Sequence, residues 1–258
     1  MNVPIKEEIL VDVILPNYNK STFLKEAIDS VVNQSFRKFH LYIIDDNSTD
    51  NSIRIINNYS KLENITIIKL NKNMGPSFCR NYGMRVSKSK YISFIDSDDT
   101  WMKEKLEKQI YFMEKENLSF TYTDYIPFFE KEGKKQFKKR TSLKDSFNFD
   151  TFTKNSSINT TTMVIRRSIL KNIRFRNIKL CEDYLFKCNL LKKNKTAKKL
   201  NENTAFYRIL EKSRSSKRIE NIYWLWYINK TYNGFKFIQN IISIALISLN
   251  SIKKYGIK

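Results

Sequence analysis

Three aspartates directly follow a short apolar segment, in the stretch YISFIDSDDTW at residues 91–101. Asp96 and Asp98 flank one serine, and Asp99 comes next. Two carboxylates spaced in this way at the end of a strand can both face a hard divalent cation, and Mg²⁺ or Mn²⁺ prefers oxygen ligands that it shares with a phosphate. The same spacing also occurs in polar turns. The place of the stretch in the fold decides whether it is a metal site.

Two other acidic pairs could take part in chemistry. Asp45 and Asp46 follow FHLYII and could accept hydrogen bonds from a ribose hydroxyl or a base, or could cap a turn. Glu182 and Asp183 lie in CEDYLFKCNLL, where a carboxylate could remove a proton from an attacking hydroxyl or could begin a helix. Arg80 could contact a phosphate or a base, or form a surface ion pair.

Apolar segments alternate with helical patterns through the first half of the chain. The expected strands are 9–15, 39–44, 64–70 and 91–95, and the expected helices begin at about 21, after 45–52, at 76 and at about 103. This alternation over short connections predicts a parallel sheet covered by helices. Ligands of such sheets bind beyond the carboxyl ends of the strands. PNYN, DDNS and DSDD all lie at those ends, so we expect them along one edge.

The second half of the chain is less regular. It is expected to contain strands at 120–125, 159–167 and 204–209, a basic loop through about 155, a helix at 181–191 and a helical, aromatic segment from about 216. No linker or internal repeat separates independent domains. We therefore predict one α/β domain over residues 1–215 and a helical C-terminal tail over 216–258.

Composition limits the class of protein. The 258 residues are 41% hydrophobic and 14% aromatic, which is typical of a globular protein, and the net charge of +21 favours anionic partners unless it reflects a general lysine enrichment. Three cysteines without CxxC spacing indicate a reducing compartment and no zinc site, and His40 alone cannot form a histidine-based triad. The first 16 residues are too acidic for a signal peptide, so we expect a cytoplasmic protein.

Several stretches together resemble family 2 glycosyltransferases, which have the GT-A fold. In the family's order and spacing they are VDVILPNYNKSTFLKEAIDSVVNQSF, LYIIDDNSTDNS, NMGPSFCRNYGM and YISFIDSDDTW. YTDY, NTTTMVIRR, CEDYLF and AFYRILEKSRSS extend the resemblance to about residue 216. The pattern is similar to bacterial transferases of teichuronic acid, capsule and O-antigen synthesis.

The resemblance implies the reaction. A sugar would pass, with inversion, from a nucleotide-diphosphate sugar to a hydroxyl of a glycan or lipid-linked acceptor in cell-surface polysaccharide synthesis. Residues 1–101 would form the nucleotide-sugar half, and 102–215 the acceptor half. A Mg²⁺ or Mn²⁺ ion would neutralise the departing diphosphate.

The resemblance also assigns residues on the donor side. Pro16, Tyr18 and Asp46 match positions that hold the base and the ribose. Arg80 matches a position in the RN segment that helps to hold the nucleotide. Asp96 is expected to support both nucleotide and metal binding.

The remaining assignments concern the metal and the chemistry. Asp98 in the D-x-D matches the direct metal ligand. Asp183 matches the catalytic base of the ED motif, with Glu182 as the next candidate. A Y-R…S segment near the diphosphate contains Tyr207, Arg208 and Ser213. Related sequences vary beside the ED motif, where this chain has Cys181, and the acceptor is therefore unassigned.

Two other functions compete with glycosyl transfer. A nucleotidyltransferase could also use a parallel sheet with acidic metal ligands, but a glycine-rich phosphate loop would be expected where this chain has PNYNKS. A non-enzymatic nucleic-acid binder would fit the positive charge, but no recognised binding module is present, and we expect no nucleic-acid partner.

The tail contains an apolar stripe. Residues 235–252 read FKFIQNIISIALISLNSI, which polar residues interrupt too often for a membrane span. The stripe, flanked by lysines, is formed by Phe235, Ile238, Ile242, Ala245, Leu249 and Ile252. This stripe predicts one of three arrangements. The helix lies on the cytoplasmic face of an anionic membrane, or the stripe packs on the transferase domain, or it forms a homodimer interface.

Overall fold

Residues 9–210 and 218–255 are described by the structure, a computed structural model. The strands are β1 (Val11–Asn17), β2 (Phe39–Asp45), β3 (Ile65–Lys69), β4 (Tyr91–Phe94), β5 (Thr100–Trp101), β6 (Phe120–Lys131), β7 (Lys134–Phe137), β8 (Ser146–Phe147), β9 (Val164–Arg166) and β10 (Ala197–Arg208). The helices are α1 (Ser21–Val32), α2 (Ser52–Asn57), α3 (Pro76–Val86), α4 (Lys105–Lys115), α5 (Phe149–Thr153), α6 (Glu182–Asn194), α7 (Arg218–Thr231) and α8 (Phe237–Tyr255). Two 3₁₀ turns cover Thr160–Thr162 and Arg167–Leu170.

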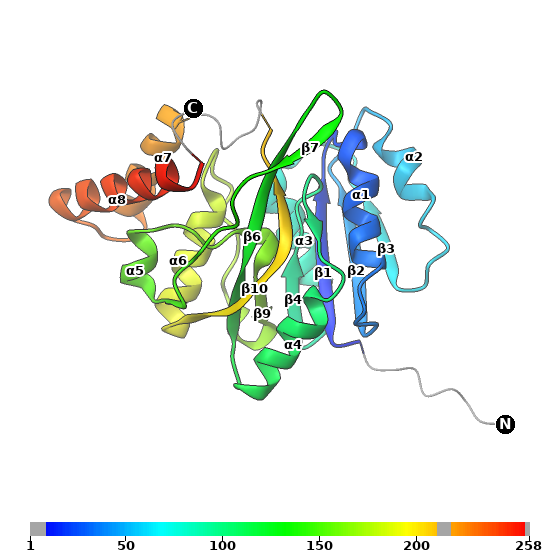
Figure 1. Ribbon diagram of the computed structural model, residues 1–258, viewed down its shortest axis with the longest axis horizontal. Coiled ribbons are helices and arrows are strands. Elements are labelled where there is room, and N and C mark those ends of the chain that lie inside the picture. Colours follow the sequence, from blue (N-terminus) through cyan, green and yellow to red (C-terminus); the bar gives the residue numbers. More distant parts are fainter. Residues whose placement is uncertain (1–8, 211–217, 256–258) are drawn as a thin grey trace.

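One sheet passes through the centre of the molecule in the order β3-β2-β1-β4-β9-β6-β10-β5, with β7 beside β6 and β8 beside β10. Helices α1 and α2 lie at one end of the molecule, whereas α7 and α8 lie at the opposite end, beyond α6 (Figure 1). The predicted α/β fold with a helical tail is therefore confirmed.

The first half forms the parallel part of the sheet. β1 pairs in parallel with β2 and β4, and β2 pairs in parallel with β3. All seven residues of β1 are buried, as expected for a strand with helices on both faces. The predicted alternation of four strands with four helices is confirmed.

A glycine lets α3 approach β1 closely. A Cβ atom added at Gly83 would lie 2.6 Å from Cγ2 of Ile14, a distance that real Cβ contacts essentially never show. Pro76 occupies the first turn of α3, after Gly75 with its positive φ of 82°. This close packing places the side chains of α3 beside the carboxyl ends of β1 and β4.

The second half departs from a purely parallel sheet. β9 runs antiparallel to both β4 and β6, while β10 runs parallel to β6. The sheet is continuous across the predicted division at residue 101, because β5 pairs with β10. The segment 159–167, predicted as a strand throughout, begins with a 3₁₀ turn and becomes a strand only at Val164.

The prediction of a basic loop through residue 155 is wrong. β6 continues to Lys131 and turns back as β7, an antiparallel hairpin, and β8 and α5 follow before residue 155. All four residues of β7 are exposed, so its lysines can face water while the backbone pairs with β6. Charge alone therefore did not distinguish a loop from a solvated edge strand.

The side of α8 that meets the protein is formed by the buried Asn240, Ser243 and Ile247 rather than by the apolar stripe. Asn240 and Ser243 are 1% exposed, whereas Ile238 is 70% and Leu249 62% exposed. The suggestion that the stripe packs on the transferase domain is therefore wrong for most of the stripe. Phe235 is the exception, because its ring centre lies 6.1 Å from that of Phe149. Within the described chain, no helix is both long and apolar enough to cross a membrane.

Candidate active site

A cleft of about 970 Å³ opens at the carboxyl ends of the parallel strands, a volume suited to a ligand the size of a nucleotide sugar. It brings together every predicted site residue that the structure describes. These are Pro16, Tyr18, Asp46, Arg80, Asp96, Asp98, Glu182, Asp183, Tyr207 and Arg208. Ser213 lies outside the described residues.

One wall of the cleft comes from the first half of the chain. Asp46 is 2% exposed and accepts hydrogen bonds from the backbone nitrogens of Met74, at 2.7 Å, and Gly75, at 2.8 Å. It thereby holds the 73–75 loop against the end of β2. Tyr18 is 46% exposed and presents its ring at the rim. The polar loops after β1, β2 and β4 meet here as the sequence predicts.

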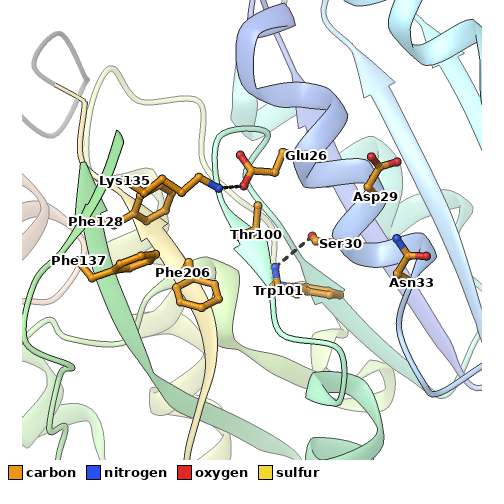
Figure 2. A pocket seen from close by; sticks show the side chains of 10 residues that line it. All are labelled: Glu26, Asp29, Ser30, Asn33, Thr100, Trp101, Phe128, Lys135, Phe137 and Phe206. Atoms are coloured by element: carbon orange, nitrogen blue, oxygen red, sulfur yellow. Dashed lines mark hydrogen bonds and ion pairs between the residues drawn. The ribbon is translucent and has the colours of Figure 1, made fainter. Parts of the chain in front are cut away.

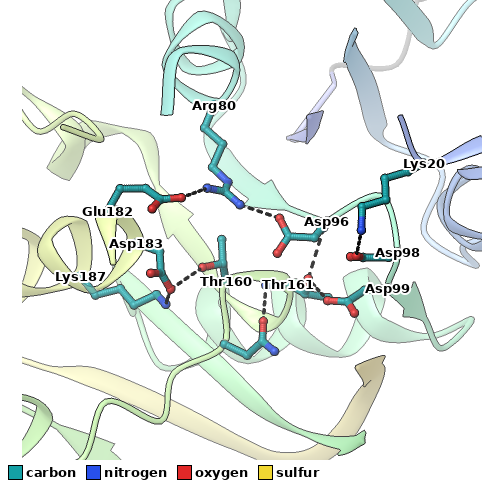
Figure 3. Close-up of polar contacts among 11 residues, drawn as sticks. Lys20, Arg80, Asp96, Asp98, Asp99, Thr160, Thr161, Glu182, Asp183 and Lys187 are labelled. Carbon is teal, nitrogen blue, oxygen red and sulfur yellow. Dashed lines mark hydrogen bonds and ion pairs between the residues drawn. The ribbon is translucent and has the colours of Figure 1, made fainter. Parts of the chain in front are cut away.

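Arg80 joins the two halves at the floor of the cleft. Its Nη2 lies 2.7 Å from Oδ1 of Asp96, and its Nη1 lies 3.4 Å from Oε1 of Glu182 (Figure 3). The side chain is 7% exposed. Desolvation alone would lower the pKa of Arg80, but the charges of Asp96 and Glu182 raise it above its ordinary value. The guanidinium therefore remains positive and fixes both carboxylates.

The three aspartates of D-S-D-D have different partners. Asp98 accepts an ion pair from Nζ of Lys20 at 2.7 Å and keeps 22% of its side chain exposed. Asp99 is fully buried and accepts hydrogen bonds from Oγ1 of Thr161, at 2.6 Å, and from the backbone nitrogen of Arg208, at 3.0 Å. Burial, and then the neighbouring carboxylates, raise the pKa of Asp99. Asp98 thus faces the cleft, whereas Asp99 anchors the loop.

Arg208 supports Asp98 from behind. Its Nε donates to the carbonyl oxygen of Asp98 at 2.9 Å, and its Nη2 contacts Oε2 of Glu26 at 2.6 Å. Lys135 of β7 also binds Glu26, at the edge of a smaller hollow of about 270 Å³ (Figure 2). Glu130 is a further partner of Arg208. The β6–β7 hairpin, which the sequence predicted as a loop, therefore stabilises the D-x-D segment through Glu26 and Arg208.

The opposite wall contains Asp183, at the first turn of α6. Its Oδ2 lies 2.7 Å from Nζ of Lys187 and 3.4 Å from Oγ1 of Thr160, and its side chain is 41% exposed (Figure 3). Desolvation would raise the pKa of Asp183, but Lys187 and then Arg80 lower it. The carboxylate is therefore ionised at neutral pH and accessible, whereas the side chain of Glu182 is only 8% exposed.

Several contributors were not identified from the sequence. Lys20, Thr160, Lys187 and Lys254 belong to the cleft or contact its carboxylates. Lys187 follows Asp183 by four residues on a helix, so this i,i+4 spacing could have indicated the pair. Lys20 and Lys254 carry no comparable signal, because their neighbours in space are remote in sequence.

Comparison with known proteins gives a consistent result. The protein-family model described as Glycosyl transferase family 2 matches residues 12–174 of this chain. A Bacillus subtilis protein named as a teichuronic acid biosynthesis glycosyltransferase, TuaG, is 32% identical over 95% of this chain and 97% of its own length. The Escherichia coli protein WfaP, a UDP-Glc:alpha-D-GlcNAc-diphosphoundecaprenol beta-1,3-glucosyltransferase, is 30% identical over 95% of both chains.

Solved structures share the fold at lower identity. Staphylococcus aureus TarS 1-349 in complex with UDP-GlcNAc superposes with a TM-score of 0.71 and 20% identity, over 95% of this chain and 73% of that one. The mannosyltransferase PcManGT from Pyrobaculum calidifontis, in complex with GDP-Man and Mn²⁺, gives a TM-score of 0.68 and 12% identity, over 98% and 77%.

Proposed function

Because this chain belongs to glycosyl transferase family 2 and is a glycosyltransferase of the GT-A fold, we propose that it moves a sugar from a UDP-sugar to a hydroxyl of a glycan or lipid-linked acceptor in cell-surface polysaccharide synthesis. One observation carries the proposal: a single cleft has Asp98 on one wall and Asp183 on the other. The donor diphosphate and the attacking hydroxyl can therefore meet between them. The UDP and the lipid-linked acceptor are inferred from the relatives.

The donor would bind along the wall of the first half. Tyr18 offers a ring for stacking on the base, beside Pro16. Both carboxylate oxygens of Asp46 accept hydrogen bonds from the 73–75 loop. Asp46 would therefore shape the ribose site as well as contact the ribose. Arg80 would hold the sugar-diphosphate side through its fixed positive charge and through Asp96.

The residues present fit a divalent cation at Asp98. A cation is already accommodated there, since the Lys20 ammonium lies 2.7 Å from this carboxylate. Among the described residues, no group of three His, Cys, Asp or Glu side chains could hold an ion alone, so the phosphate oxygens of the donor would complete the coordination. Mg²⁺ or Mn²⁺ bound there supplies charge neutralisation for the leaving diphosphate.

Asp183 would act as the general base. Lys187 keeps its carboxylate ionised and in place, while the 41% exposure leaves the carboxylate open to an acceptor hydroxyl. The hydroxyl oxygen forms the new bond to the anomeric carbon as the carbon–oxygen bond to the diphosphate breaks, and the proton passes to Asp183. One displacement inverts the anomeric centre.

The direct test is product analysis. The purified protein would be incubated with Mn²⁺, a panel of UDP-sugars and sugar-diphosphate lipid acceptors, and the released nucleotide would be identified. Release of UDP with a lengthened glycan supports glycosyl transfer. Release of pyrophosphate would indicate nucleotidyl transfer and contradict the proposal.

We also propose that the protein acts on the cytoplasmic face of the membrane through the exposed side of α7 and α8. Most exposed large hydrophobic side chains of the described chain lie here, among them Ile219, Tyr223, Phe237, Ile238, Ile242 and Leu249. Helix α8 contains no acidic residue, and the exposed Lys230 and Lys236 precede it. An apolar face beside lysines suits an anionic bilayer.

Flotation on phosphatidylglycerol vesicles tests this placement. The double variant Ile238→Ser, Ile242→Ser should lose flotation, whereas Tyr111→Ser should not, because Tyr111 is similarly exposed, at 68%, but lies on α4. Analytical ultracentrifugation without lipid tests whether the protein forms a homodimer. A dimer that dissociates in the double variant, combined with no flotation of the wild type, would assign the apolar face to self-association instead.

A further inference from the structure

The cleft has a second cationic position, on the wall formed by the tail. Four basic residues of the described chain line the cleft: Lys20, Arg80, Arg208 and Lys254. The first three form ion pairs with carboxylates. Lys254, near the end of α8, forms none within the described residues, and its Nζ hydrogen-bonds to the hydroxyl of Ser157. A cation turned into a cleft without a counter-ion is suited to an anionic ligand.

This position belongs to the acceptor wall. Lys254 hydrogen-bonds to Ser157, and three residues further along the same segment Oγ1 of Thr160 lies 3.4 Å from Oδ2 of Asp183, the proposed base. Desolvation and the charge of Lys187, which pairs with Asp183, lower the pKa of Lys254 to about 8, despite an opposing effect of Asp124. Lys20 and Asp98, in contrast, pair with each other on the donor wall.

The surroundings of Lys254 combine hydroxyl groups with an apolar path to the surface. Ser248 and Ser251 of α8 line the cleft beside it and can donate to phosphate oxygens. Ile247 and Ile252 also line the cleft, and Ile252 is 41% exposed on the apolar face of the same helix. A ligand that suits this arrangement carries a negative group and a hydrocarbon chain on one molecule.

We propose that Lys254, with the hydroxyls of α8, binds the phosphate that joins the acceptor sugar to its lipid, so that the hydrocarbon chain leaves along the exposed face of α8. This inference rests on the proposed function, because it assigns the acceptor half of the same cleft. According to this proposal, α8 contributes residues to the acceptor site and is more than a helix that packs on the transferase domain. The acceptor sugar then lies between the bound phosphate and Asp183.

Binding of farnesyl diphosphate, measured by calorimetry with UDP and Mg²⁺ in constant excess, tests the proposal without requiring transfer. The wild type should bind. Lys254→Met should weaken the affinity at least tenfold, and Lys254→Arg, which keeps the charge, should stay within about threefold. Lys253→Met is the matched control, since this neighbouring lysine is exposed, and it should leave the affinity unchanged. Thermal unfolding verifies that each variant is folded, and Lys254→Gln replaces Lys254→Met if the latter is not.

Three results would overturn the proposal: no binding by the wild type, equal binding by Lys254→Met, or an equal loss in Lys253→Met. Flotation on phosphatidylglycerol vesicles separates the acceptor phosphate from a bilayer headgroup. Lys254→Met should float like the wild type, and a loss of flotation would assign the lysine to the membrane and contradict the inference. If transfer is never observed while farnesyl diphosphate binding depends on Lys254, the proposed function fails but the anion site stands.

Discussion

The two walls of the cleft are held in place by different kinds of contact. The donor wall follows from backbone pairing, because parallel neighbours β1, β2 and β4 end at the same edge, with Asn17 opposite Asp45 in the register. The acceptor wall is assembled from separate segments, namely 155–160, the start of α6, α7 and the end of α8. Side-chain hydrogen bonds join these segments, such as the one from Nζ of Lys254 to the hydroxyl of Ser157.

This difference indicates how each wall can change. A wall set by sheet register keeps its geometry as long as the strands keep their apolar pattern. A wall set by side-chain contacts between distant segments can be rebuilt by a few substitutions. We infer that the nucleotide site is the more constrained part of the cleft and the acceptor site the more adaptable part.

The largest expected effect is on chemistry at the acceptor wall. Asp183→Asn removes the proposed base while its amide can still accept from Lys187, so sugar transfer should fall about 10²- to 10⁴-fold. UDP affinity, measured by calorimetry, should be unchanged because the donor wall is intact. Transfer near the wild-type rate would place the base elsewhere, with Glu182 as the next candidate.

A smaller effect is expected at the donor wall. Asp98→Asn should reduce Mn²⁺-dependent UDP affinity roughly 100-fold, because a neutral amide replaces the charged metal ligand, and should leave thermal unfolding nearly unchanged. The measurement is UDP titration with and without Mn²⁺. Unaltered metal dependence would rule out Asp98 as the ligand.

Substitution of Lys20 should change the Mn²⁺-dependent UDP affinity in the opposite direction in the same experiment. Lys20→Met removes the ammonium that competes for Asp98, so the gain in UDP affinity on adding Mn²⁺ should increase several-fold. Lys25→Met is a matched control, since Lys25 pairs with Asp29 on the same helix at 2.6 Å but lies on the outside. Equal effects of the two variants would indicate only a general charge effect.

A further prediction concerns the polar contacts that attach α8. Asn240 is buried, accepts from Nδ2 of Asn229 at 3.1 Å and donates to the carbonyl oxygen of Trp226 at 3.0 Å. Asn240→Ala should therefore cost about 1–3 kcal/mol of local stability. Hydrogen exchange should accelerate in α8 and not in β1 or β2. Faster exchange throughout the sheet would show that the two walls unfold together.

The smallest effect concerns Lys105, a buried residue of α4 that lies against β4, where β4 pairs with β9. It lies 3.2 Å from Oγ of Ser93 and 4.0 Å from the centre of the Trp101 ring, and desolvation lowers its pKa to about 7. Between pH 7 and 10.5 the unfolded chain therefore binds this proton more strongly than the folded protein, so the contribution of Lys105 to stability rises with pH.

Comparison with Lys105→Met isolates that contribution from the buried thiols and tyrosines. The difference in unfolding free energy between wild type and variant should change in favour of the wild type by about 1 kcal/mol per pH unit from pH 7.5 to 9.5. Urea unfolding at several pH values measures it. A difference independent of pH would show that the amine is not desolvated in the folded protein.

The sequence alone determined the donor wall and left the acceptor wall open. Strand and helix patterns in the first half are local, and parallel strands necessarily bring PNYN, DDNS and DSDD to one edge. The motif resemblance also located Asp183 correctly within the cleft, although its role stays a prediction. The basic hairpin was missed because exposed edge strands carry the same charges as loops.

Only the tertiary structure decided which face of α8 meets the protein. Periodicity located the apolar stripe, but it predicts a buried face only when apolar burial attaches the helix. Here Asn240 and Ser243 both accept hydrogen bonds from Asn229, so these polar residues are buried together with Ile247, and most of the stripe is exposed. The pairing of Lys20 with Asp98 and the position of Lys254 beside Ser157 also depend on contacts between residues that are 78 and 97 positions apart in the sequence. Such contacts leave no periodic trace in a single sequence, because each involves only one residue from each segment.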